Sequence, residues 1–82
     1  MQRRIYAEAY ELKAGGFRGV AAEFADKAVV GDVQRGEVRP TLQEARNDAI
    51  AAAKRILAGR PFAGGHYRNT RSSWRYNYWL EM

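Results

Sequence analysis

The side chains with the most chemical potential gather near the end of the chain. Residues 66–82, "HYRNTRSSWRYNYWLEM", hold one histidine, three arginines, two tryptophans and three tyrosines. Histidine is the side chain most often used as a general base, and His66 follows two glycines. No second acid or base stands near it in the sequence. We therefore expect His66 to be a loop histidine and the chain to be a binding protein without enzymatic activity.

Metal and cofactor chemistry lack the residues they require. The chain has one histidine, no cysteine and no cluster of carboxylates, whereas a protein zinc site needs three or four nitrogen, sulfur or oxygen ligands. Its glycine pairs do not form a phosphate-binding motif such as GxGxxG or a P-loop. We expect neither a metal ion nor a cofactor.

The net charge of +5 is unevenly distributed and is carried mainly by arginine. Residues 60–82 hold Arg60, Arg68, Arg71 and Arg75 against Glu81, so most of the excess lies in the last quarter of the chain. Arginine makes bidentate contacts with carboxylates and phosphates and stacks on aromatic rings. A localised basic patch indicates an anionic partner, which is an acidic protein surface, a nucleoprotein complex or nucleic acid itself.

One helix has both of its ends marked in the sequence. Thr41 and Glu44 form a T-x-x-E capping box, and Gly59 and Pro61 end the helical pattern. Between them, apolar residues recur at helical spacing and are mostly alanines. Alanine allows close approach of the backbone, so we expect this helix to lie flat on a sheet.

The remaining segments alternate with the period of two that is typical of strands. We expect strands over residues 3–13, 17–25 and 28–34, a short one near 37–39, a glycine-containing loop over 60–70, and a last strand over 71–80. The sequence therefore predicts a single domain, residues 1–82, of the α+β class. It would be a two-layer sandwich with an antiparallel sheet and one main helix, in the order β-β-β-α-β.

The last strand has two different faces. Trp74, Tyr76 and Tyr78 alternate with Arg75, Asn77 and Trp79, so we assign the first set to the core and the second to the surface. Tyr6 and Tyr10 share one face of the first strand and are either stacking residues or part of the core. The predicted partner-binding residues are Arg18, Arg60, Tyr67, Arg68, Arg71, Arg75, Asn77 and Trp79.

The stretch "GFRGVAAEFADKAVVGDV…TLQEARNDAIAAAKRIL" resembles the HicB-type pattern, in which strands lead to a capped T-L-x-E-A helix. This resemblance implies a partial double-stranded-RNA-binding-domain arrangement and the neutralisation of a toxin ribonuclease. The segment "GGHY" resembles the surroundings of the catalytic histidine in HicA ribonucleases, which would give His66 a role in RNA cleavage. In size, charge and architecture the chain also resembles phage anti-CRISPR proteins.

We expect a small phage or mobile-element inhibitor that docks through a basic, aromatic surface on a nucleic-acid-handling complex. The alternatives are a HicB-like antitoxin domain and a direct RNA- or DNA-binding module. No apolar run approaches the roughly 20 residues of a membrane span, and residues 1–10 lack the apolar segment of a signal peptide. We therefore expect a cytoplasmic protein that is a monomer or a homodimer.

Overall fold

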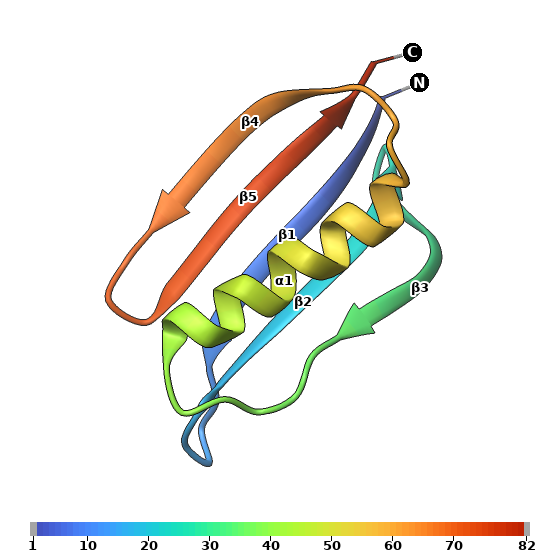
Figure 1. Cartoon of the computed structure of the whole chain (residues 1–82). Helices are drawn as coiled ribbons and strands as arrows, with labels where there is room; N and C mark the ends of the chain where they lie inside the picture. The colour runs from blue at the N-terminus through green and yellow to red at the C-terminus, as the bar shows by residue number, and fades with distance from the viewer. Residues whose placement is uncertain (1, 82) are drawn as a thin grey trace.

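The computed structural model describes residues 2–81, apart from the side chain of His66, and shows an α+β fold. Five antiparallel strands form one sheet in the order β3-β2-β1-β5-β4, and one helix packs against it (Figure 1). The elements are β1 (Arg3–Glu11), β2 (Phe17–Ala25), β3 (Ala28–Arg35), α1 (Leu42–Leu57), β4 (Phe62–Asn69) and β5 (Ser73–Leu80). The predicted class, antiparallel sheet and single main helix are confirmed.

The expected loop over residues 60–70 is wrong, because most of that segment is β4. The pairing of β4 with β5 shifts register between Gly64 and Tyr67, so the alternation is broken where the sequence carries two glycines. The expected short strand near residues 37–39 is also wrong, since only an isolated bridge joins Arg39 to Phe17. The element order is therefore β-β-β-α-β-β.

The ends of α1 follow the predicted signals. The Thr41 hydroxyl accepts a hydrogen bond from the Glu44 amide at 3.2 Å, and it donates one to the Glu44 carboxylate at 2.8 Å. At the other end Ala58 and Gly59 have left-handed backbones, with φ of 51° and 80°. These caps provide partners for backbone groups that a helix terminus leaves without intrahelical bonds.

The core is thin and rich in alanine. Ile5, Ala7 and Ala9 of β1 and Ala21 of β2 face the helix, and the helix presents its own small residues to them. The buried helix residues are Ala45, Ala49, Ala52, Ala53 and Leu57. A Cβ atom at Gly19 of β2 would collide with the Ala45 carbonyl oxygen. The helix and strand backbones are therefore in direct contact at this point.

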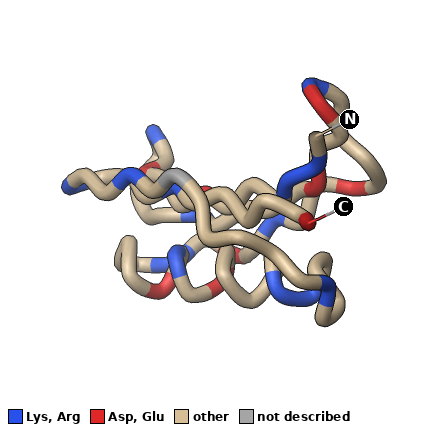
Figure 2. Tube along the Cα trace, turned by 90° about the horizontal axis from the view of Figure 1, so that it is seen from above, with Lys and Arg blue, Asp and Glu red and all other residues tan. Residues whose placement is uncertain are grey.

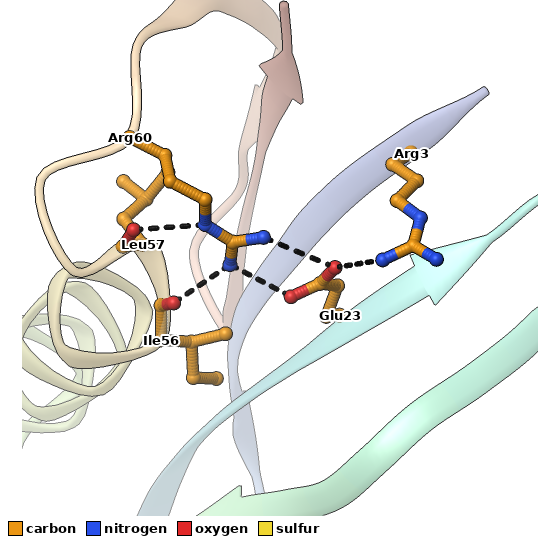
Figure 3. A network of polar contacts seen from close by, with 5 residues as sticks. All are labelled: Arg3, Glu23, Ile56, Leu57 and Arg60. Carbon is orange, nitrogen blue, oxygen red and sulfur yellow. Dashed lines mark hydrogen bonds and ion pairs between the residues drawn. The ribbon is translucent and has the colours of Figure 1, made fainter. Parts of the chain in front are cut away.

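Ion pairs join the C-terminal end of α1 to the sheet (Figure 3). Arg60 donates to the Glu23 carboxylate at 2.7 Å and to the carbonyl oxygens of Leu57 and Ile56 at 3.0 and 2.7 Å. Arg3 approaches Glu23 from β1 at 3.2 Å. The hydrogen bond from Arg60 outweighs the burial of the carboxyl group and lowers the pKa of Glu23. Arg60 thus joins the last helical carbonyls to β2.

The helix covers only one side of the sheet. Seen from above in Figure 2, α1 lies on one side, and no element of the described residues covers the other. Within that one side, α1 packs mainly against β1 and β2, while β4 and most of β5 lie beside it (Figure 1). The uncovered surfaces therefore include the far face of the sheet and the part of the near face over β4 and β5, and every residue of β3 at the opposite edge is exposed as well.

We predict that Gly19→Ala destabilises the fold by about 1–3 kcal/mol, because the added methyl group forces α1 away from β2. Urea unfolding followed by circular dichroism measures the change. Ala58→Gly is the control, since glycine tolerates the left-handed backbone at that helix end and should leave stability unchanged or raise it. An unchanged unfolding midpoint for Gly19→Ala would contradict the direct backbone contact.

The Glu23 network makes stability depend on pH in a defined direction. The folded pKa of Glu23 lies below its ordinary value of 4.5, so its contribution is fully present above that value and is lost as the pH falls through the folded pKa. Glu23→Gln should cost about 1–2 kcal/mol at pH 7 and progressively less below pH ~4. Urea titrations at several pH values test this, with the exposed Glu11→Gln as control. A pH-independent loss would argue against an ion-pair role.

Candidate functional site

The uncovered far face of the sheet, here called the open face, carries the second side-chain set of β5. Antiparallel pairing of β5 with β1 places Trp79 opposite Arg4, Asn77 opposite Tyr6, and Arg75 opposite Glu8. Trp74 and Tyr78 are only 4% and 6% exposed and belong to the core on the helix side. The two-face assignment of the last strand is confirmed, and its surface set shares a face with Tyr6 and Tyr10.

An arginine surrounded by aromatic rings lies on the open face, near the end of the sheet where β1 begins and β2 and β5 end. The guanidinium carbon of Arg4 is 4.8 Å from the ring centroid of Phe24, 5.4 Å from that of Tyr6 and 5.9 Å from that of Trp79. Its Nη1 donates to the Asn77 side-chain oxygen at 2.9 Å. We call these five residues the Arg4 cluster. The rings and the amide hold a planar cation in one orientation.

Next to the cluster, Arg75 donates to the Glu8 carboxylate at 3.0 Å. The arginine side chain is 50% exposed, so this pair contributes little to stability. The hydrogen bond to Glu8 raises the pKa of Arg75. Burial, followed by the nearby negative charge of Glu8, raises the pKa of Tyr6, so this phenol stays neutral at physiological pH.

Further cations border this face. By strand alternation Arg18, which is paired with Tyr10, and Arg68, which is paired with Arg75, lie on the same side as the cluster. Arg71 is exposed in the turn between β4 and β5. Of the residues that alternation places on the open face of β1, β2, β4 and β5, Glu8 alone is acidic. The surface is therefore basic.

Two predicted partner-binding residues lie elsewhere. Arg60 is on the helix side, where it is held by Glu23 and by helix carbonyls. Tyr67 is paired with Tyr76, a residue of the helix-side set, and the two rings make an edge contact with centroids 6.3 Å apart. The structure thus brings together Arg18, Arg68, Arg75, Asn77, Trp79, Tyr6 and Tyr10, but not Arg60 or Tyr67.

The sequence analysis missed Arg4 and Phe24, two members of the cluster. Arg4 shares the alternation of Tyr6 within β1, which is a local signal that could have found it. Phe24 reaches the cluster through the register of β2 with β1, which pairs it with Arg4. That register involves residues 20 positions apart, and the alternation inside either strand does not specify it.

The expectation about His66 falls on a side chain outside those described, although its backbone lies in β4. The described residues contain no group of three or more histidine, cysteine, aspartate or glutamate side chains placed to hold a metal ion. Within residues 2–81, no helix is both long and apolar enough to cross a bilayer.

The described geometry is thus a basic surface that carries three aromatic rings around Arg4 at one end of the sheet. Protein-family models, curated proteins and solved structures contain no match to this chain.

Proposed function

We propose that this chain is a non-enzymatic binding protein that docks through its open face on an anionic surface of a nucleic-acid-handling protein complex. The observation that carries the proposal is the Arg4 cluster, a fixed guanidinium among three aromatic rings on a face that no helix covers. Tryptophan, tyrosine and arginine are the residue types most enriched among interface hot spots.

The cluster is organised before any partner arrives. Asn77 and the rings of Tyr6, Phe24 and Trp79 already restrict Arg4. Trp79 is restricted in turn, because its indole lies where a Cβ atom of Gly65 would be. Binding by such a surface loses little side-chain entropy, and this is a main determinant of affinity at a given interface area.

The other cations of the open face give the surface its preference for a negatively charged partner. Arg75 and Arg68 lie farther along the open face, Arg18 lies toward its other end, and Arg71 lies in the turn of the β4–β5 hairpin. Such charges accelerate association with an acidic or phosphate-bearing surface and disfavour basic ones. Together with the small size of the chain, this supports an inhibitor of the phage type, similar in its mode of action to anti-CRISPR proteins.

A HicB-like antitoxin domain is the second candidate, favoured by the order of β1, β2, β3 and α1. The same open face would then dock on a toxin ribonuclease. Direct binding of RNA or DNA is a third outcome, since aromatic rings and arginines on a sheet face suit unpaired bases as well. These candidates differ in what the protein retains after nuclease treatment.

Affinity capture from a lysate of the native cell, with and without nuclease, tests the proposal. We expect one protein complex that survives nuclease. In a binding assay with that complex, Trp79→Ala should weaken affinity by about 2 kcal/mol or more, as for a buried hot spot. Arg68→Glu should slow association and make it less sensitive to salt.

The control is Arg55→Glu, which makes the same charge change at an exposed helix position and should bind like the unmodified chain. Each variant is checked for folding by its far-ultraviolet spectrum. Undiminished binding by folded Trp79→Ala would overturn the docking surface. Recovery of mixed nucleic acid that nuclease abolishes would replace protein docking by direct binding, and recovery of a ribonuclease would favour the antitoxin.

A further inference from the structure

A groove runs along the helix side of the sheet, where α1 leaves β4 and β5 uncovered (Figure 1). It has a volume of about 310 Å³, which is in the range of ligand sites. We call it the aromatic groove. Its lining residues are Arg46, Ile50 and Lys54 from the helix and Phe62, Tyr67, Trp74, Tyr76 and Tyr78 from the two strands.

Its strand side is a continuous set of aromatic rings. Trp74 and Tyr76 are parallel, with an interplanar angle of 3° and centroids 6.3 Å apart. Tyr67 meets the edge of Tyr76, and Phe62 meets Tyr78 at 5.0 Å. Tyr67 and Phe62 are 54% and 42% exposed. Trp74 and Tyr78 form the buried base of the groove, and the two exposed rings are the surface that a ligand would contact.

A glycine allows the rings to lie close to β4. A Cβ atom at Gly64 would come within 2.7 Å of the Tyr76 hydroxyl oxygen, which is closer than nonbonded atoms tolerate. Tyr76 is half-buried, so the Tyr76 phenol rests against the strand and contributes a fixed wall to the groove.

The helix side of the groove is cationic. Arg46, Ile50 and Lys54 are spaced four residues apart and form one row along α1, so the backbone positions of the two cations are separated by about 12 Å at 1.5 Å per residue. Arg46 lies over the Trp74 ring at 5.8 Å. None of the lining residues is acidic. The groove therefore fits an elongated anion that carries planar aromatic groups.

We propose that the aromatic groove binds unpaired nucleotides of a single-stranded nucleic acid. A base would stack on Tyr67, the most exposed ring of the groove, and phosphates would contact Arg46 and Lys54. A stacked nucleic-acid strand rises ~3.4 Å per phosphate, so the length of helix between the two cations spans about three nucleotides. The groove lies across the sheet from the open face, and the inference stands whether or not the open face docks on a partner.

The other occupants fit the charges less well. An apolar peptide would cover the rings but would leave Arg46 and Lys54 without counter-charges at its edge. A second copy related by twofold symmetry would present the same cations to the groove, and each copy has a net charge of +5. Single-stranded nucleic acid supplies bases that can stack on the rings and phosphates that can pair with Arg46 and Lys54.

Amide chemical-shift mapping with a single-stranded adenylate tetramer tests this directly. We expect shifts in β4, in β5 and along α1 from Arg46 to Lys54, with affinity that falls as salt rises. AMP and adenosine are the companion probes. If the tetramer binds more strongly than AMP, the groove is a site for single-stranded nucleic acid. If AMP binds as strongly as the tetramer, the groove is a site for a free nucleotide. Adenosine should bind more weakly than AMP because it lacks the phosphate.

Two variants separate stacking from charge. Tyr67→Ala should weaken tetramer binding roughly 5- to 150-fold, the range for loss of one base–aromatic stack. Lys54→Gln should weaken it about two- to fivefold, as for an exposed charge contact. Arg55→Gln removes the neighbouring helix cation, which does not line the groove, and should leave the affinity unchanged. Tyr67 is largely exposed, so its variant should fold.

Three results would overturn the site. The first is the absence of any shift with the tetramer and with AMP at millimolar concentration. The second is a set of shifts confined to the open face, which would support direct binding there and not in the groove. The third is a dimer in solution whose interface covers Tyr67 and Phe62, because the rings would then be occupied by a second copy.

Discussion

The direct contact between α1 and β2 at Gly19 determines how the rest of the molecule is arranged. The helix meets the sheet through alanines and one glycine, so its backbone can approach the two strands β1 and β2 closely. Its small side chains cannot extend over a wider area, so the five-stranded sheet is broader than the layer that covers it. Both the open face and the aromatic groove follow from this mismatch in width.

Because the core consists mainly of small side chains, polar contacts are also important for its stability. Ile5 is the largest side chain that is fully buried among the described residues. The apolar area that folding removes from water is therefore small for each core residue. Trp74, Tyr78 and the Glu23 network supplement it. Because Arg60 also accounts for the last helical carbonyls, one side chain ends the helix and attaches it to β2.

Local signals in the sequence predicted the capped helix, the alternation of β1 and β5, and thus most of the open face. They failed at β4, where Gly64 and Gly65 coincide with a register shift that hides the alternation. Phe24 and Arg60 depend on partners 20 or more residues away, so a pattern within one segment could not place them. The aromatic groove depends on the strand order, which puts β5 beside β1 and β4 at the edge.

Strand β5 belongs to both candidate surfaces, since Trp74, Tyr76 and Tyr78 face the groove and Arg75, Asn77 and Trp79 face the other way. The two surfaces are therefore separated by a single layer of backbone, and β4 is the only strand between β5 and solvent at that edge of the described sheet. A bulge and the exposed Arg68 make this edge a poor template for pairing with another strand. If both proposals hold, a nucleoprotein partner reaches the two surfaces by passing around β4, with its acidic protein surface on one side and its unpaired nucleic-acid strand on the other.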